Sequence, residues 1–172
     1  MLLLLLTATN PTDSVAVTPE VSAPKVHCQI PCGIYSDKTR IDLIMEDTAT
    51  IAKGMTKLAE LAKASPTNYN QVVRWVKNKD EHADNIQKMV MTYWLAQRIK
   101  APKDASDAAA MARYQKQLVL LHGITVASMK CKQTTDLKWP AKLKQLTFEF
   151  SENYFTKKDL EHLKKHRDHD HK

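Results

Sequence analysis

The stretch that decides the fold is DKTRIDLIMEDTATIAKGMTKLAELAKA, residues 37–64. Mainly apolar side chains recur in it every three or four residues, which is the spacing of one face of an α-helix. They are Ile41, Ile44, Met45, Thr48, Ile51, Ala52, Met55, Leu58, Ala59 and Ala62. Ser36 or Asp37 can cap the start of this helix, and Ser65-Pro66 ends it. The stretch therefore predicts a long amphipathic helix whose apolar face needs partners.

Three further helical patterns follow the first one. The second runs from residue 67 or 68 to about 100, and its apolar stripe is interrupted at residues 78–80, where we expect a bend or break. The third starts at Asp104 or Ser106 and ends between residues 132 and 134, and the fourth runs from about Pro140 to Tyr154. Four amphipathic helices with short connections predict an all-α protein, an antiparallel four-helix bundle.

The third pattern fixes which residues of that helix we expect to be buried. The face expected to point inward carries Ala108, Met111, Ala112, Gln115, Leu118, Val119, His122, Thr125, Val126 and Met129. His122 on this face is predicted to be a core histidine. Cys131 near the helix end is predicted to be a small buried hydrophobe.

Composition excludes several classes of protein. The chain has 172 residues, a length typical of one domain, with three glycines, three cysteines and a formal net charge of +7. No glycine-rich phosphate-binding motif occurs in it. No apolar run reaches the 18 residues of a membrane span, so we expect no membrane partner. The charges are spread along the chain, so we expect a solvated basic surface and no nucleic-acid partner, although a basic helical module that binds acidic partners is an alternative.

The two ends differ from the helical part. Residues 1–26 begin with a short apolar run and contain Pro11, Pro19 and Pro24, which predicts a leader: a disordered segment, a pro-segment or a poor targeting peptide. Residues 156–172 form a charged tail with four histidines. The tail is either a solvated terminus or a weak metal-sequestering segment.

The residues best suited to bind a metal or take part in chemistry lie where the leader ends, in HCQIPCGIY, residues 27–35. Two cysteines four positions apart, with Pro31 between them and Gly33 after them, can turn their sulfurs toward one point. Thiolates together with the imidazole of His27 suit Zn, Cu, Fe or Ni. The residues alone also allow a disulfide, half of a structural zinc site, or an unoccupied thiol pair in a reducing compartment.

The whole string resembles the amino-terminal hook of the nickel superoxide dismutases. The matching positions are His27, Cys28, Pro31, Cys32, Gly33 and Tyr35, and a weaker resemblance continues to about Trp94. The resemblance implies a domain at residues 27–155, made of a hook at 27–35 and a helical bundle at 37–155. It also implies assembly into a homohexamer and proteolytic removal of residues 1–26 by a processing protease.

The resemblance further implies the metal and its ligands. One nickel ion per subunit would be bound by the α-amine of His27, the backbone nitrogen and sulfur of Cys28, and the sulfur of Cys32. The imidazole of His27 would add an axial bond in the oxidised state. Cycling between Ni(II) and Ni(III) would disproportionate superoxide to O2 and H2O2. An alternative is a non-catalytic helical protein that binds or stores nickel.

Three more residues are candidates near the metal. Tyr35 belongs to the motif, and in the family such a tyrosine screens access to the metal. Asp42 corresponds to an acidic residue that holds the axial imidazole, and the alternative is a solvated aspartate in the first helical turns. His82 stands where the family has an arginine, and it can donate a hydrogen bond to a carboxylate. Thiols that must stay reduced favour the cytoplasm, and the leader leaves export or an organelle as the alternative.

Overall fold

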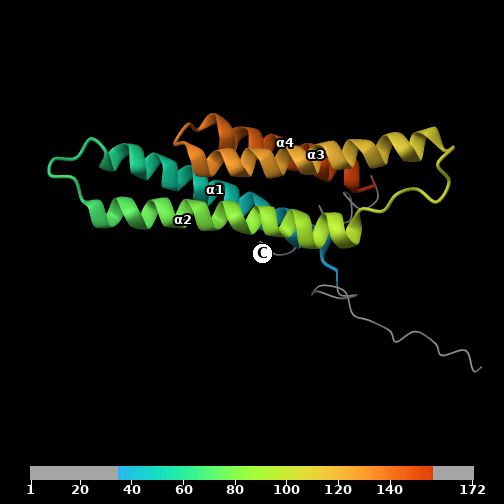
Figure 1. Ribbon diagram of the computed structural model, residues 1–172, viewed down its shortest axis with the longest axis horizontal. Helices are drawn as coiled ribbons and strands as arrows, with labels where there is room; N and C mark the ends of the chain where they lie inside the picture. The colour runs from blue at the N-terminus through green and yellow to red at the C-terminus, as the bar shows by residue number, and fades with distance from the viewer. Residues whose placement is uncertain (1–34, 157–172) are drawn as a thin grey trace, which may run out of the picture.

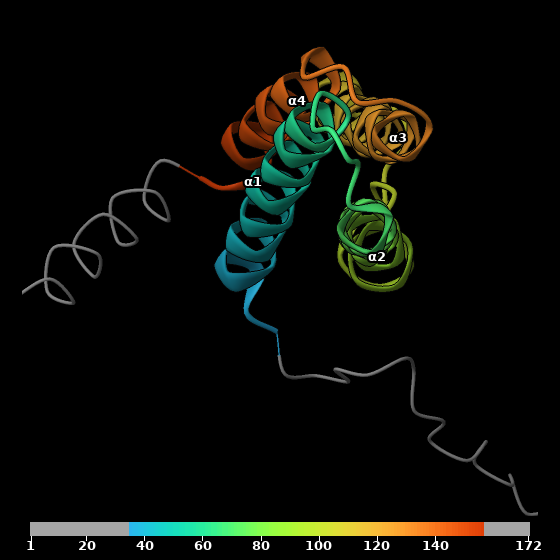
Figure 2. The same ribbon diagram turned by 90° about the vertical axis from the view of Figure 1, so that its left-hand side faces the viewer.

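The computed structural model describes residues 35–156, which form four α-helices and one π-helical segment and contain no strand. The elements are α1 (Asp37–Leu61), α2 (Tyr69–Met89), η1 (Val90–Arg98), α3 (Ala108–Gln133) and α4 (Lys138–Tyr154). Helix α1 packs along α2 and α4, and α3 packs along α2 and α4 (Figures 1 and 2). The all-helical class predicted from the sequence is confirmed. The predicted leader (1–26), the hook up to residue 34 and residues 157–172 of the tail lie outside the described residues.

The buried face of α1 follows the prediction from Ile41 to Leu58, whereas Ala59 and Ala62, which were also predicted to face inward, are exposed. Ile44, Ile51 and Met55 are completely buried, and Thr48 satisfies its hydroxyl by donating to the carbonyl of Ile44 at 2.6 Å. These side chains belong to one hydrophobic core with residues of the other helices, among them Trp94. The helix ends at Leu61, three residues before the predicted end.

The bend expected at residues 78–80 was wrong, because α2 continues through it. Lys79 is 3 % exposed there, and two of the three hydrogen bonds of its ammonium group reach outside the helix. The Nζ atom donates to the backbone carbonyls of Cys131 and Lys132 at 3.0 and 2.9 Å and to Asp80 Oδ1 at 2.7 Å. A polar residue interrupts the apolar stripe in the sequence without interrupting the helix, because its charge binds the carboxyl end of α3.

The buried face predicted for α3 was also wrong. The helix buries Gln117, Leu120, Leu121, Ile124, Ala127, Ser128 and Cys131. Val119 is 66 % exposed, and His122 lies on the surface rather than in the core. Residues 118–121 are all apolar, so their spacing does not choose a face. The choice is made by tertiary contacts, such as the 2.7 Å hydrogen bond from Ser128 Oγ to the carbonyl of Ala83.

The ends of α3 differ from the prediction at the start and agree with it at the finish. The helix begins at Ala108, later than the predicted Asp104 or Ser106, because the carboxylate of Asp107 accepts the amide hydrogen of Ala110 at 3.0 Å. It ends at Gln133, and Cys131 is a free, completely buried cysteine as predicted.

None of the helices within residues 35–156 has the length and apolar character that a membrane span requires.

The arrangement brings three segments together at one end of the bundle. The start of α1, the segment η1 and the end of α4 lie at the same end, which Figure 1 shows on its right-hand side. A hydrogen bond between Tyr154 and Asp37, which are 117 residues apart in the chain, joins two of them. The chain enters the bundle at this end, directly after the predicted hook.

Replacing Lys79 with methionine tests its role at the end of α3. Lys79→Met leaves two carbonyls of α3 without their charged donor, so we expect a loss of about 2–3 kcal/mol in the free energy of unfolding. The measurement is urea denaturation followed by far-UV circular dichroism. Lys77→Met is the matched control, because Lys77 is exposed and lies 3.5 Å from an exposed Glu81; it should cost less than about 0.5 kcal/mol. Equal losses in the two variants would contradict the capping role.

Candidate metal centre

The predicted nickel ligands His27, Cys28 and Cys32 lie outside the described residues. Tyr35, three positions after Cys32, is the first described residue and marks the place where the predicted hook joins the bundle. The geometry available for the site is therefore that of Tyr35 and of the residues that hold it.

Tyr35 is 39 % exposed and is contacted by three residues of η1. Its hydroxyl donates to Gln97 Oε1 at 3.3 Å. The guanidinium carbon of Arg98 lies 4.5 Å from the centre of its ring, and Tyr93 meets the ring edge-on at 5.9 Å. The ring is thus held on its face, along its edge and at its hydroxyl, although it lies at the surface.

Asp37, two positions after Tyr35, accepts hydrogen bonds from three side chains. Arg98 approaches as a fork, with Nε 2.8 Å from Oδ1 and Nη2 2.6 Å from Oδ2. The hydroxyls of Tyr93 and Tyr154 donate at 2.5 and 2.7 Å. One carboxylate therefore ties the start of α1 to η1 and to the end of α4.

The π-helical geometry of η1 explains how two of these donors reach one carboxylate. Tyr93 and Arg98 are five residues apart, a spacing that places them on different faces of a regular α-helix. A π-helix forms hydrogen bonds between residues five apart, and the amide of Ile99 does bond to the carbonyl of Trp94, at 2.9 Å. The wider turn brings Tyr93 and Arg98 onto the same side of η1, facing Asp37.

The network keeps Asp37 ionised and its tyrosines neutral. Burial raises the pKa of Asp37, but the hydrogen bonds from Arg98, Tyr93 and Tyr154 outweigh burial and hold the pKa below its usual value. Burial, followed by the hydrogen bond to Asp37, raises the pKa of Tyr154 to about 12, and the same two causes raise the pKa of Tyr93. The hydrogen bond to Asp37 raises the pKa of Arg98, so this ion pair persists over the neutral range.

The other two candidates, Asp42 and His82, take part in two separate contacts in the structure. Asp42 lies on the exposed side of α1, where its carboxylate pairs with Lys38. His82 does bind a carboxylate, as predicted, and the partner is Asp47, with Nδ1 2.6 Å from Oδ1. Asp47 is largely buried; burial raises its pKa, and the hydrogen bond with His82 offsets only part of that effect. Asp42 and His82 are therefore not a pair in this structure.

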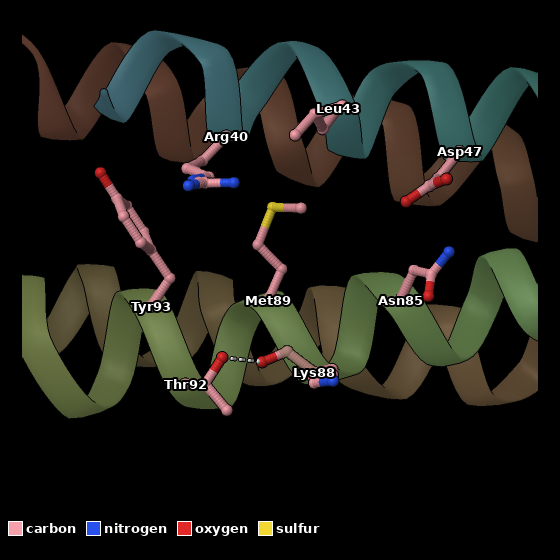
Figure 3. A pocket seen from close by; sticks show the side chains of 8 residues that line it. All are labelled: Arg40, Leu43, Asp47, Asn85, Lys88, Met89, Thr92 and Tyr93. Atoms are coloured by element: carbon pink, nitrogen blue, oxygen red, sulfur yellow. Dashed lines mark hydrogen bonds between the residues drawn. The ribbon is translucent and has the colours of Figure 1, made fainter. Parts of the chain in front are cut away.

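A groove between α1 and the continuous stretch of α2 and η1 runs from Tyr93 to Asp47, the partner of His82. Its volume is about 320 Å³. The lining residues are Arg40, Leu43, Asp47, Asn85, Lys88, Met89, Thr92 and Tyr93 (Figure 3). Arg40 reaches into the groove from α1, with its guanidinium carbon 5.0 Å from the centre of the Tyr93 ring. Its Nε is buried and has no hydrogen-bond partner within residues 35–156, so this cation differs from the paired Arg98.

The described helices do not supply a metal site of their own. Within residues 35–156, no three side chains of histidine, cysteine, aspartate or glutamate gather in a way that could hold a metal ion. Burial raises the pKa of the Cys131 thiol to about 11, so this cysteine stays protonated and is a poor ligand. The predicted nickel ligands are the hook residues.

Sequence reasoning missed Asp37, Arg98, Tyr154 and Asp47 as parts of the site's surroundings. Asp37 was interpreted as a helix-capping residue, a role that an acidic residue at a helix start usually has. The available signal was the five-residue spacing of Tyr93 and Arg98, but it indicates a shared face only once a π-helix is assumed. Asp47 lies about one turn from Ile44 and Ile51 on α1, and nothing else in the sequence indicated that it belongs near the site.

The pH dependence of stability tests the Asp37 network. Because the pKa of Asp37 is lowered in the folded state, its contribution is complete above its ordinary pKa of 3.8 and is lost as the pH falls through the folded-state value. We expect Asp37→Asn to cost about 2–3 kcal/mol at pH 7 and less at about pH 3. Urea denaturation at the two pH values measures the difference. Asp42→Asn, the control on the same helix, removes an exposed carboxylate and should cost less than about 0.5 kcal/mol at pH 7. A loss for Asp37→Asn that stays constant down to about pH 3 would contradict this account.

Comparison with known proteins identifies one family. The sequence model of the nickel-containing superoxide dismutases matches residues 20–158, a span that includes the hook residues 27–35 and all four described α-helices. No curated protein and no solved structure matches the chain. The matched span covers most of the 172 residues. The chain therefore belongs to the nickel-containing superoxide dismutase family, a family of oxidoreductases.

Proposed function

We propose that this chain, once residues 1–26 have been removed, disproportionates superoxide at a nickel ion held by its hook, residues 27–35. The observation that carries the proposal is the string HCQIPCGIY, which lies within the residues matched by the family. The string ends on Tyr35, which the bundle holds at its surface through η1.

The donor set fits nickel. The α-amine of His27, the backbone nitrogen and thiolate of Cys28, and the thiolate of Cys32 make two nitrogen and two sulfur donors, a set suited to the square-planar geometry of Ni(II). When bound, nickel would supply the one-electron cycle that oxidises one superoxide to O2 and reduces another to H2O2. The thiols and the amide must lose protons to bind, so loading should increase with pH.

The residues of the bundle would control access and charge. Tyr35 stands at the junction of hook and bundle, where its ring shields one side of the predicted site. The net charge of +7 favours the approach of an anionic substrate, and Arg40, whose Nε has no hydrogen-bond partner within residues 35–156, places a cation near Tyr93 at the same end of the molecule. We further propose that His82 and Asp42 support the imidazole of His27. The support for His82 is its hydrogen bond with Asp47, which fixes the ring.

We propose assembly into a homohexamer and activity in the cytoplasm, with export or an organelle as the alternative compartment. The support for assembly is the apolar surface of the single chain. Met91 on η1, Val119 on α3 and Phe148 on α4 are between 57 and 66 % exposed, and burial against neighbouring copies would remove them from water.

Nickel loading of processed and unprocessed chains tests the proposal. We compare a chain that starts at His27 with the full-length chain, in which the nitrogen of His27 is a peptide amide and no longer an amine. The processed chain should bind nickel, give a rhombic Ni(III) EPR signal with axial nitrogen coupling, and consume superoxide; the full-length chain should stay at the background rate. Equal turnover by both chains would refute the processing step.

Matched cysteine variants complete this test. In the processed chain, Cys28→Ser should lose nickel, whereas the same exchange at the buried Cys131 should retain it. Nickel that is bound but shows no redox activity would favour the alternative, a nickel-binding or storage protein.

Replacing Tyr35 with phenylalanine tests the role of its hydroxyl. Tyr35→Phe removes the hydrogen bond to Gln97, which contributes roughly 1 kcal/mol, and keeps the ring on which Arg98 stacks. We expect unchanged nickel content and a several-fold change in superoxide turnover, measured by stopped-flow absorbance and metal analysis. Tyr69→Phe, at a tyrosine that is 75 % exposed, is the control and should change neither quantity. Loss of nickel in Tyr35→Phe would argue against a screening role.

A further inference from the structure

We infer that Arg98 is the positioning residue for Tyr35 and that Asp37 holds Arg98 in place for this task. The inference rests on the proposed function for what Tyr35 does in the reaction. The part of the inference that concerns the orientation of the Tyr35 ring depends only on contacts among the described residues.

Arg98 contacts two residues at the start of the described part of the chain, Tyr35 and Asp37. Its guanidinium covers the face of the Tyr35 ring at 4.5 Å, and its Nε and Nη2 atoms bind the two oxygens of Asp37. A planar guanidinium can form a two-point contact through its edge while its face stacks on an aromatic ring. A lysine in its place would offer a point charge without a flat face.

The ion pair also indicates what Arg98 does not do. Asp37 is 15 % exposed and neutralises the guanidinium at hydrogen-bond distance, so Arg98 contributes little to long-range attraction of an anion. The Nε of Arg40 in the neighbouring groove is buried and has no hydrogen-bond partner within residues 35–156. The two arginines at this end therefore have different roles: Arg40 attracts anions, and Arg98 orients Tyr35.

The position of Tyr35 in the chain makes its orientation matter for the hook. Cys32 precedes Tyr35 by three residues, and Asp37 follows it by two. The clamp formed by Arg98 across Tyr35 and Asp37 therefore orients the first described residues, which directly follow the proposed ligands in the chain. Gln97, the neighbour of Arg98 on η1, holds the hydroxyl of the same tyrosine.

Fluorine NMR of the metal-free full-length chain tests the orientation directly. The chain has five tyrosines, and 3-fluorotyrosine labelling gives each a signal, with that of Tyr35 assigned by its loss in Tyr35→Phe. Arg98→Lys keeps a positive charge but loses the stacked face, so we expect the Tyr35 signal to shift and to approach that of an exposed tyrosine. Asp37→Asn should move the same signal in the same direction, because it releases Arg98.

Two controls separate positioning from general loss of structure. Arg74→Ala removes an exposed arginine from α2, roughly 35 Å from Arg98 along the helix axis, and should leave the Tyr35 signal unchanged. Tyr154→Phe removes a different donor to Asp37 and keeps the two-point contact between Arg98 and Asp37, so it should shift the Tyr35 signal much less than Arg98→Lys does. An unchanged Tyr35 signal in Arg98→Lys, or an equal shift in Tyr154→Phe, would overturn the inference.

Kinetics of the processed, nickel-loaded chain supply the second measurement. Arg98→Lys should retain its nickel content and its Ni(III) EPR signal while kcat/KM for superoxide falls about tenfold. An unchanged kcat/KM would overturn the role of Arg98 in the reaction. If the chain binds no nickel or shows no turnover at all, the proposed function fails, whereas the fluorine signal of the metal-free chain still decides whether Arg98 positions Tyr35.

Discussion

The carboxylate of Asp37 is the interaction on which this end of the molecule depends. It accepts hydrogen bonds from Arg98, Tyr93 and Tyr154, and so joins the start of α1, the segment η1 and the end of α4. A largely buried carboxylate is stable as an anion only when donors replace the water it has lost, and here three side chains do so. These donors also restrict the geometry of η1. Tyr93 and Arg98 reach the same group because the helix widens into a π-helix between them.

This constraint explains why the irregular part of the second helical stretch lies where it does. The apolar stripe is interrupted at residues 78–80, yet the helix is regular there, because Lys79 finds its partners at the end of α3. The stripe is intact at residues 90–94, yet the π-helix begins at Val90. The spacing of apolar residues indicates which side chains face the core. It does not reveal the local change from an α-helix to a π-helix that lets Tyr93 and Arg98 both bind Asp37.

Sequence predicted the parts of the fold that local spacing controls, and it failed where distant contacts decide. The buried face of α1 followed from its repeat, because polar residues clearly flank that face. The face of α3 did not follow, because residues 118–121 are apolar on every side and Ser128 enters the core by bonding to Ala83. The candidate ligands are adjacent in the chain, so they were visible as a motif. Their support was not, since Arg98 and Tyr154 come next to Asp37 only after folding, across 61 and 117 residues.

The proposed metal site, made from a chain terminus, would present a particular mechanical problem. Ligands carried by helices are fixed on both sides, whereas ligands in a terminal segment are joined to the protein at one end only. The precision of such a site then depends on the few residues that anchor the junction. Here the junction carries Tyr35 and Asp37, and Arg98 contacts both. The ion pair with Asp37 also makes Arg98 a weaker attractor of anions than Arg40, which lies about one helical turn from Asp37 on α1 and whose buried Nε has no hydrogen-bond partner within residues 35–156. In the proposed function, Arg98 would therefore orient the junction while Arg40 attracts the anionic substrate.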